Sequence, residues 1–335
     1  MPALAVADAL RAEGAEVVFV GGDRAELELV PAAGYELRTL RVVPLPRRRP
    51  AKALHAGVIA AGAVREARRV LKQVRPAAVL GGGGYVAGPV GLSAVVSRVP
   101  LVLTEADSHL GLTNRALAPV ARRVCLSFPV DGRDGARYVV TGRPVPAPAT
   151  DWEAARARFG IGLRESCVLV FGGSQGARSI NRAAVEAFAG ARFHVLHAAG
   201  ERDLHELQEM RPPAPHYDLR GYVSRFGEAL LAADLVVARA GGSIFEIAAH
   251  GRPAVLVPYP YATADHQTGN ARFMERAGAA VVIPDRELTP ARLAHEVGSL
   301  LADPSRLAAM ARASASLARP NAARDIAHEL LAAAR

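Results

Sequence analysis

Cysteine is scarce in this sequence, since Cys125 and Cys167 are the only two among 335 residues. Two isolated cysteines exclude a disulfide-stapled scaffold and indicate a reducing compartment. The histidines and carboxylates have no spacing typical of a metal-ligand set, so we expect no metal. No cationic segment followed by an apolar core stands near the start, so we expect no signal peptide there.

Long uncharged runs are rare as well. Only residues 76–97 raise the question of a membrane span, and this run contains six glycines, four of them consecutive, together with Pro89. Such a composition predicts a strand, a loop and a buried helix instead. Aromatic residues make up 5% of the chain, yet half of all residues are hydrophobic, which excludes disorder as the main state.

The length predicts two domains, because it is about twice that of a usual single domain. A helix is expected over residues 2–11, and short apolar strands then alternate with helical stretches. This alternation is typical of βαβ units around parallel sheets. The expected strands are residues 17–20, 78–80, 101–104, 138–140, 168–171, 194–197, 235–238 and 254–258.

A proline-rich segment, residues 142–150, divides these strands into two sets. Three prolines in nine residues predict a stiff, extended linker. We therefore expect one Rossmann-like domain over residues 1–145 and a second over residues 146–335. Ligands bind beyond the carboxyl ends of strands in such sheets, so the loops at those ends are the candidate sites.

The first candidate loop is Gly81, Gly82, Gly83 and Gly84 followed by Tyr85. Glycines let a phosphate or a sugar approach the backbone amides, although a tight strand-to-helix turn is the alternative. A second glycine-rich loop, residues 172–178, joins an apolar strand to a helix. It is neither a Walker loop nor a dinucleotide fingerprint, but its helix start favours an anion.

A third loop, residues 239–247, also joins a strand to a helix. Ser243 and Glu246 have the spacing of a capping box, which the local sequence favours, and binding of a ribose diol is the alternative role for Glu246. A fourth loop, residues 261–270, carries Asp, His, Gln and Asn side chains, which suit either a hydroxyl-rich ligand or a solvated loop with a helix cap. Glu105, Asp107 and His109 follow another strand and are candidates for acid and base chemistry.

Five ordered segments resemble those of the bacterial peptidoglycan N-acetylglucosaminyltransferases over essentially the whole chain. They are residues 81–89, 111–114, 172–178, 239–246 and 265–271. The resemblance implies the GT-B fold, with two Rossmann-like domains and an interdomain cleft. It implies an inverting enzyme that moves N-acetylglucosamine from its UDP donor to the C4 hydroxyl of undecaprenyl-pyrophosphoryl-N-acetylmuramoyl-pentapeptide, without a cofactor or an essential metal.

The resemblance also implies roles for particular residues, mostly in the second half. Ser174 would contact the diphosphate, the backbone of Val223 would frame the uracil, and Glu246 would hold the ribose diol. Gln267 would contact the donor sugar. The segment that would wrap the nucleotide is Gly242, Ser243, Ile244 and Phe245.

The sequence departs from the family pattern at its start, where the family has a strand and a Gly-Gly-Thr-Gly-Gly-His loop before the position of Pro2. The family's histidine base belongs to that loop, so the base of this chain is not identified. Our hypothesis for the difference is a start codon assigned too late. Asp107 stands where the family has Asn, and Arg143 replaces the Asn of another motif, but both remain candidate substrate-binding residues.

The positive charge is concentrated in the first half. The chain carries a net charge of +9, and residues 1–145 hold twenty basic and twelve acidic side chains. Residues 38–75 contain eleven Arg or Lys, including residues 47–49, and a single acid, Glu66. With the apolar residues 53–64 this suits an anionic membrane, at about 1 kcal/mol per basic residue, although a solvated helix face is the alternative.

These features predict a peripheral protein on the cytoplasmic face of the membrane. Nucleic-acid binding is not expected, because no aromatic interleaving accompanies the charge. Two other hypotheses stay open: a non-catalytic, nucleotide-binding relic of the same family, and a Rossmann-type oxidoreductase or epimerase. The lack of a dinucleotide fingerprint and of a Tyr-x-x-x-Lys pair counts against the latter.

Overall fold

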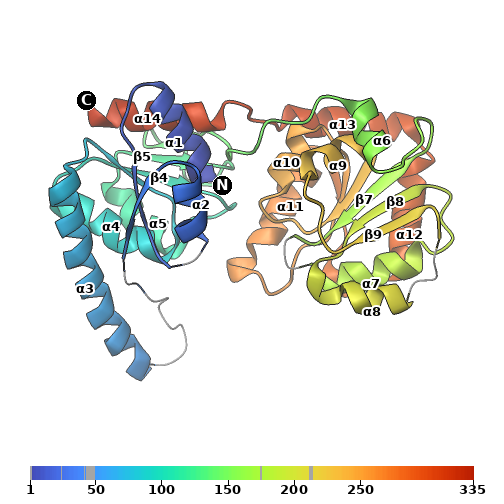
Figure 1. The fold of residues 1–335 in the computed structure, drawn as a ribbon, viewed down its shortest axis with the longest axis horizontal. Coiled ribbons are helices and arrows are strands. Elements are labelled where there is room, and N and C mark those ends of the chain that lie inside the picture. The colour runs from blue at the N-terminus through green and yellow to red at the C-terminus, as the bar shows by residue number, and fades with distance from the viewer. Residues whose placement is uncertain (1, 24, 41, 43–49, 174–175, 211–213) are drawn as a thin grey trace. The chain divides into compact units, whose positions relative to one another are not determined.

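The computed structural model describes residues 2–23, 25–40, 42, 50–173, 176–210 and 214–335. The chain forms two compact units (Figure 1). One comprises Met1–Val145 with Pro320–Arg335, and the other comprises Pro146–Arg319. We expected the second domain to continue to residue 335, but the final helix packs in the first unit.

The second unit is built on one six-stranded parallel sheet with the order β12-β11-β10-β7-β8-β9. Its strands are β7 (Cys167–Phe171), β8 (His194–Ala198), β9 (Tyr217–Arg220), β10 (Leu235–Ala238), β11 (Ala254–Leu256) and β12 (Ala280–Val282). The chain starts on the central strand β7, moves outward through β8 and β9, and then returns to the other side of β7 at β10. The strand order therefore reverses between β7 and β10, which is where nucleotides bind in sheets of this kind.

Helices cover both faces of this sheet, which explains why its strands are continuously apolar. All five residues of β7 and all four of β10 are buried. The helices are α6 (Trp152–Arg158), α7 (Arg178–Ala187), α8 (Glu201–Met210), α9 (Phe226–Ala232), α10 (Ile244–Ala249), α11 (His266–Arg276), α12 (Pro290–Leu301) and α13 (Pro304–Ser316), with single turns η2 (Thr263–Asp265) and η3 (Asp285–Glu287).

The first unit contains two parallel sheets, β1-β2 and β3-β4-β5-β6. Their strands are β1 (Val18–Gly21), β2 (Glu36–Thr39), β3 (Val79–Gly81), β4 (Leu101–Glu105), β5 (Arg123–Leu126) and β6 (Tyr138–Val140). The helices are α1 (Pro2–Ala12), α2 (Glu26–Ala32), α3 (Pro50–Val74), α4 (Gly84–Val96), α5 (Leu112–Leu117) and α14 (Ala322–Ala334), with a single turn η1 (Ala118–Val120).

Helix α14 is held in the first unit by apolar packing and by one ion pair. Ile326 and Leu330 share a buried cluster with Val6 of α1 and with the β5 residue Cys125. Arg123 Nε donates to Glu329 Oε2 at 2.9 Å. Segments from the two ends of the chain therefore lie side by side, as Figure 1 also shows.

All the expected strands are present, with shifts of one or two residues, and α1 confirms the expected helix. Residues 76–97 form β3, a loop and α4, as predicted. The structure adds β2, β5, β9 and β12, which were not among the expected strands; charged residues interrupt the apolar pattern in β2 and β9. Among the described residues, no helix is both long and apolar enough to span a membrane.

Candidate functional site

The candidate donor site lies at the carboxyl edge of β7, β10 and β11, which are neighbours in the sheet of the second unit. Three of the four predicted glycine-rich or polar loops follow these strands. Parallel pairing puts the carboxyl ends of the three strands at one edge. The sheet topology thus brings together segments that are up to about a hundred residues apart in the sequence.

The loop after β7 depends on glycine. Gly173 and Gly176 have φ angles of 92° and 71°, which L-residues with a side chain rarely adopt. A Cβ on Gly176 would lie 2.1 Å from the carbonyl oxygen of Ala199. Helix α7 follows with Ala177 as its N-cap and without a side-chain cap, so the amides of its first turn are available to an anion. Ser174, the predicted diphosphate contact, lies outside the described residues.

The loop after β10 leads into α10 and carries the predicted nucleotide-wrapping segment. Ile244 and Phe245 are buried, so this segment can meet a nucleotide through its backbone rather than through these side chains. Ser243 has helical backbone angles and its side chain makes no capping bond. One of the two bonds of a capping box, the one from the Ser243 side chain, is therefore absent, and Glu246 is half-buried in the first turn of α10.

The loop after β11 meets the loop after β10 through two amide side chains of α11. The Asn270 Nδ2 donates to the carbonyl oxygen of Ala240 at 3.0 Å, and Asn270 is 1% exposed. Gln267 Oε1 accepts a bond of 2.9 Å from the backbone amide of Tyr259. A Cβ built on Gly241 would lie 3.9 Å from Gln267 Nε2. The predicted sugar contact therefore lies directly beside the nucleotide-wrapping segment.

Arg239 connects these loops to one another, and the sequence analysis did not include it among the site residues. Its Nη1 donates to the carbonyl oxygens of Val257 and Pro258, each at 3.1 Å, and to Asp285 Oδ1 at 2.6 Å. Its Nη2 donates to Ser179 Oγ in the first turn of α7 at 2.8 Å. Its position at the end of an apolar strand was a sequence signal that could have identified Arg239 as a site residue. Its partner Asp285, 46 residues away in the sequence, had no such signal.

Val223 and Arg143 lie elsewhere. Val223 is buried in the loop after β9, at the same edge of the sheet but separated from β7 by β8. Arg143 follows β6 in the first unit and is half-buried. The described contacts do not join either residue to the Arg239 network.

The candidate acceptor site of the first unit lies at the carboxyl ends of β3 and β4. Gly83 and Gly84 have φ angles of 77° and 75°, so the glycine-rich loop adopts a backbone conformation that requires glycine. A Cβ on Gly83 would lie 3.5 Å from Asn114 Nδ2. Thr113 Oγ1 donates to the carbonyl oxygen of Gly84 at 2.9 Å. The loop after β3 therefore contacts the start of α5.

Glu105 organises the loop between β4 and α5. Its carboxylate accepts bonds from the backbone amides of Ala106, Asp107 and Gly111, and from Asn114 Nδ2 at 2.9 Å. Four donors occupy this buried carboxylate, so Glu105 holds the loop rather than offering a free base. Asp107 and His109, the other candidates for acid and base chemistry, are half-buried on the loop that Glu105 holds.

No cluster of three or more His, Cys, Asp or Glu side chains that could hold a metal ion occurs in the described part of the chain. The two cysteines are buried, and burial raises the pKa of each thiol to about 12. Both thiols are therefore protonated at neutral pH and are poor nucleophiles.

Comparison with known proteins gives the family. The glycosyltransferase family 28 N-terminal and C-terminal domain models match residues 1–126 and 167–330. The UDP-N-acetylglucosamine–N-acetylmuramyl-(pentapeptide) pyrophosphoryl-undecaprenol N-acetylglucosamine transferase of Moorella thermoacetica is 41% identical, over 98% of this chain and 94% of that protein. This chain belongs to the pyrophosphoryl-undecaprenol N-acetylglucosamine transferase family. The member from Halothermothrix orenii is 35% identical over 95% of this chain and 91% of its own.

A solved structure of a protein with the same architecture is the MurG of Acinetobacter baumannii. It superposes with a TM-score of 0.82 at 29% identity, over 99% of this chain and 95% of that one. The UDP-GlcNAc 2-epimerase of Neisseria meningitidis, solved with UDP-GlcNAc bound, has a TM-score of 0.67 at 14% identity, over 98% of this chain and 95% of its own, and shares the fold. The GT-B fold expected for the pyrophosphoryl-undecaprenol N-acetylglucosamine transferase family is confirmed.

Proposed function

We propose that this protein transfers N-acetylglucosamine from UDP-N-acetylglucosamine to the C4 hydroxyl of undecaprenyl-pyrophosphoryl-N-acetylmuramoyl-pentapeptide, with inversion at the sugar carbon. The observation that carries the proposal is the convergence of three loops at the carboxyl edge of β7, β10 and β11, in a chain 41% identical to a transferase named for this reaction. A site for a UDP-sugar must bind the diphosphate anion, accept hydrogen bonds from the ribose hydroxyls and contact the sugar, all in one place. These loops supply candidates for all three.

On the donor side, the first turn of α7 would bind the diphosphate, because its amides have no side-chain cap. Departure of UDP develops negative charge on the diphosphate, and amides that are already oriented stabilise that charge in the transition state. The Glu246 carboxylate would accept hydrogen bonds from the ribose hydroxyls, and Gln267 would bind the N-acetylglucosamine. Val223 would frame the uracil through its backbone.

On the acceptor side, the glycine-rich loop at Gly82, Gly83 and Gly84 would approach the pyrophosphate of the lipid-linked acceptor. The acceptor hydroxyl must lose a proton as it attacks. The amides of the loop already bond to the Glu105 carboxylate. Among the described residues, Asp107 and His109 are therefore the candidates for receiving or relaying that proton.

Discrimination between ribose and deoxyribose tests the donor assignment. Calorimetry should show that the protein binds UDP about 10- to 100-fold more tightly than 2′-deoxy-UDP, since a hydrogen bond to a charged group contributes about 1.5–3 kcal/mol. Glu246→Ala should bind both nucleotides equally weakly. The matched control is Glu186→Ala, which removes an exposed carboxylate from α7 and should leave the preference for UDP over 2′-deoxy-UDP intact. Unchanged discrimination in Glu246→Ala would contradict the proposal.

Turnover is tested by incubating the protein with labelled UDP-N-acetylglucosamine and the lipid-linked acceptor. Appearance of label in the lipid product is the expected result. Release of UDP with no lipid product would contradict the proposed acceptor, and nucleotide binding without any turnover would favour a non-catalytic relic.

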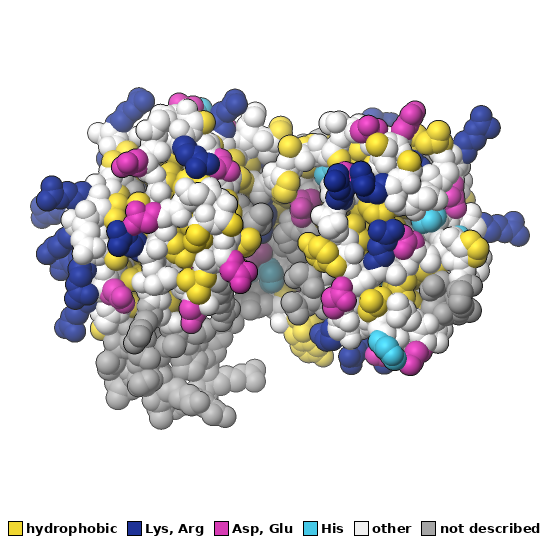
Figure 2. Space-filling view, in the orientation of Figure 1, with side chains coloured by type: hydrophobic (Ala, Val, Ile, Leu, Met, Phe, Trp, Pro, Cys, Tyr) yellow, Lys and Arg dark blue, Asp and Glu magenta, His cyan; other side chains and the backbone are white. Residues whose placement is uncertain are grey.

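We also propose that the first unit binds the cytoplasmic face of the membrane as a peripheral protein. Basic side chains project from α3, and Figure 2 shows Lys and Arg gathered along the left edge of the first unit. Helix α4 packs on α3, and it exposes the apolar side chains of Leu92 and Val96. Arg47, Arg48 and Arg49, which also support the prediction, lie outside the described residues.

Vesicle sedimentation tests this surface. The triple variant Arg68→Gln, Arg69→Gln and Lys72→Gln should bind vesicles containing phosphatidylglycerol at least tenfold more weakly, because each basic residue contributes about 1 kcal/mol. The matched control removes three exposed arginines of the second unit, Arg164, Arg286 and Arg312. Equal loss in both triple variants would indicate a general charge effect and would contradict a defined surface.

A further inference from the structure

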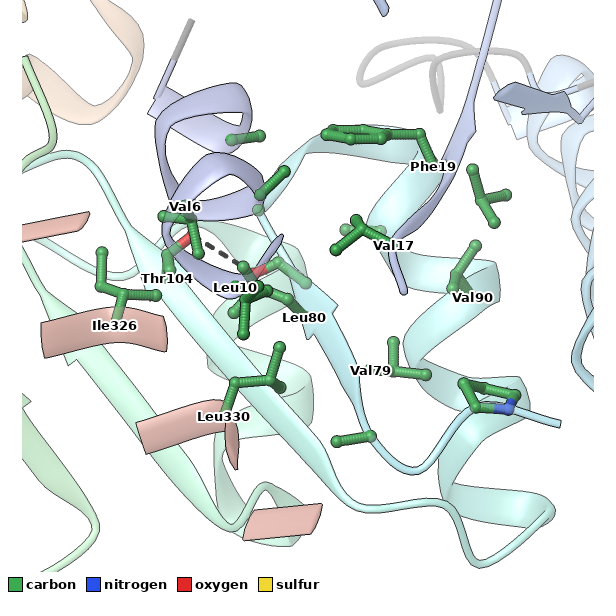
Figure 3. Close-up of a pocket in the computed structure, with 18 of the residues that line it drawn as sticks. Val6, Leu10, Val17, Phe19, Val79, Leu80, Val90, Thr104, Ile326 and Leu330 are labelled. Atoms are coloured by element: carbon green, nitrogen blue, oxygen red, sulfur yellow. Dashed lines mark hydrogen bonds between the residues drawn. The ribbon is translucent and has the colours of Figure 1, made fainter. Parts of the chain in front are cut away.

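The interiors of the two units differ in polarity. In the first unit a cavity of about 790 Å³ lies within that unit's own residues, and apolar side chains make up most of its lining. Figure 3 shows Val6 and Leu10 of α1, Leu80 of β3 and Ile326 of α14 around it. The interior of the second unit contains polar side chains that bond to one another beside the loop after β7, which is one of the candidate donor loops.

Four of these polar side chains form a continuous chain of hydrogen bonds. They are Tyr217 of β9, His197 of β8, Asn181 of α7 and Asp203 of α8, and none of them is more than 4% exposed. The Tyr217 hydroxyl lies 2.9 Å from His197 Nδ1, and His197 Nε2 lies 3.1 Å from Asn181 Oδ1. Asn181 Nδ2 donates to Asp203 Oδ2 at 3.1 Å. A buried polar group is costly without its hydrogen bond, so the four side chains are fixed as a set.

Asp203 sets the direction of every hydrogen bond in this chain. Its carboxylate can only accept, and so can the carbonyl oxygen of Ala199, to which Asn181 Nδ2 also donates at 2.8 Å. Both acceptors face the amide nitrogen of Asn181, which leaves Oδ1 to accept from His197 Nε2–H. His197 Nδ1 is then the acceptor for the Tyr217 hydroxyl. One orientation of Asn181 and one tautomer of His197 therefore follow from the charge on Asp203.

Two arginines keep Asp203 ionised. Arg202 donates from Nε to Oδ1 at 2.9 Å and from Nη2 to Oδ2 at 3.1 Å, and Arg178, the first residue of α7, donates from Nη2 to Oδ1 at 3.4 Å. These hydrogen bonds, above all those from Arg202, hold the pKa of Asp203 below its ordinary value. Both arginine side chains are 57% exposed, whereas that of Asp203 is 2% exposed. The buried carboxylate therefore anchors Arg178 at the start of α7, and the three side chains together carry one positive charge in excess.

The chain also holds the loop after β7, through the carbonyl oxygen of Ala199. Asn181 Nδ2 donates to this oxygen, and a Cβ on Gly176 would lie 2.1 Å from it and 3.4 Å from Asn181 Nδ2. Gly176 therefore packs directly on the Ala199 carbonyl and on the group that donates to it. A displacement of Asn181 would shift the surface against which the loop packs, just before the amides of α7 begin.

We propose that Asp203 is a positioning residue for the diphosphate of the donor. It acts from the interior without touching the donor, because it fixes Asn181, and with it the Gly176 loop, and also holds Arg178 at the start of α7. This role rests on the proposed function, in which the first turn of α7 binds the diphosphate of UDP-N-acetylglucosamine. The contribution of Asp203 is expected to be confined to the phosphates, since the chain ends at the loop after β7, whereas Glu246 and Val223 follow other strands.

The substitution Asp203→Asn, which keeps the size of the side chain and removes its charge, tests this role. Loss of a negative charge would by itself strengthen the binding of a diphosphate. A misplaced loop has the opposite effect, so calorimetry should show that UDP binds about 10- to 100-fold more weakly. The affinity for uridine, followed by NMR titration, should stay the same. The sign of the change therefore separates positioning from electrostatics, and the comparison with uridine separates it from a general loss of structure.

Two further variants and one spectrum support the comparison. Glu206→Gln is the matched control, because Glu206 also joins α8 to α7, through a 2.9 Å bond from Arg182 Nε, but lies on the exposed surface; UDP affinity should not change. Arg178→Gln alters an exposed side chain, so it tests the proposal even if Asp203→Asn does not fold. It should weaken UDP binding about two- to fivefold at low salt and leave uridine binding unchanged. Nitrogen-15 NMR of the wild-type protein should show His197 protonated at Nε2.

Several outcomes would overturn the proposal. Unchanged or tighter UDP binding by Asp203→Asn, or unchanged UDP binding by Arg178→Gln, would show that the diphosphate does not depend on this carboxylate. An equal loss of UDP and uridine affinity would reduce Asp203 to a general structural role, and an equal loss in Glu206→Gln would assign the effect to surface charge. A wild-type His197 protonated at Nδ1 would contradict the order of the hydrogen bonds. A wild-type protein that binds no UDP would instead overturn the proposed donor site, and that result is visible before any variant is compared.

Discussion

Arg239 and Asp285 form an ion pair with a distance of 2.6 Å between Nη1 and Oδ1, at the edge of the sheet where the candidate donor loops meet. Both side chains are largely buried, at 10% and 21% exposure. Ser179 Oγ lies in the same network, because it donates to Asp285 and accepts from Arg239. The pair therefore fixes the end of β10, the end of β11 and the start of α7 relative to one another.

Replacement of Arg239 by Lys should weaken UDP-N-acetylglucosamine binding and also lower stability. Lysine keeps the positive charge but cannot reproduce the forked contacts of the guanidinium, and each lost hydrogen bond costs about 0.5–1.5 kcal/mol. We expect KM for the donor to rise about 10- to 100-fold, since small displacements of positioning groups have effects of this size. Steady-state kinetics and thermal unfolding measure the two effects. Arg286→Lys, which changes an exposed ion pair nearby, should alter neither, and a similar change there would contradict a positioning role for Arg239.

Replacement of Glu105 by Gln should destabilise the loop between β4 and α5. The new amide group would face donors, such as the backbone amide of Gly111 and Asn114 Nδ2, and could satisfy only some of them. An unsatisfied buried donor costs about 1–3 kcal/mol, so the unfolding temperature of the first unit should fall. Differential scanning calorimetry measures this shift. Loss of kcat at an unchanged unfolding temperature would instead make Glu105 a catalytic base.

Replacement of Gly176 by Ala should disturb the loop after β7. A methyl group there would collide with the carbonyl oxygen of Ala199, and the φ of 71° is unfavourable for alanine. We expect a loss of nucleotide affinity that calorimetry with UDP detects. Gly190→Ala is the control, because nothing lies within 4 Å of its Cβ position and no positive φ is involved. Normal UDP binding by the Gly176 variant would mean that this loop does not contact the diphosphate.

The second unit should lose stability below about pH 6.5 through His250. Its Nδ1–H donates to the carbonyl oxygen of Glu246 at 2.8 Å, and its Nε2 accepts from the Ala149 amide at 3.2 Å, so the ring is bound as the neutral tautomer. Burial lowers the pKa of His250 below its ordinary value of 6.5, so the unfolded chain takes up the proton first. This stability is complete above the unfolded pKa and declines as the pH falls below it.

The pH dependence can be separated into its contributors. Burial also lowers the pKa of His194, a buried residue of β8, so it adds to the same decline. Thermal unfolding between pH 5 and pH 8 should show a shallower slope in His250→Gln, and a shallower one again with His194→Asn added. An unchanged slope in the double variant would assign the pH dependence to the carboxylates.

Much of the donor half was predictable from the sequence. The buried strands of a parallel sheet are continuous apolar runs, so β7 and β10 are visible as such, and the glycines that follow them mark their loops. The capping-box interpretation of Ser243 and Glu246 was left open because spacing alone does not specify backbone angles. In the structure Ser243 is already helical and makes no cap, which only the conformation of the whole loop could decide.

Other features could not be predicted from the sequence because they depend on contacts between distant segments. The pairing of Arg239 with Asp285 and of Asn114 with Glu105 follows from sheet order, which apolar periodicity does not encode. The placement of α14 in the first unit was also not predictable, since an amphipathic helix shows which face it buries but not against which domain. Its partner α1 lies at the other end of the chain.

The sequence by itself determined the α/β class, the family and the loops that carry polar and glycine residues, because these depend on local composition and order. The tertiary structure decided which loops meet, that the Glu105 carboxylate holds the loop that comes after it, and that β1 and β3 both line one apolar cavity. Those properties arise from backbone pairing between strands, and hydrogen bonding across a sheet leaves no periodic trace in either strand alone.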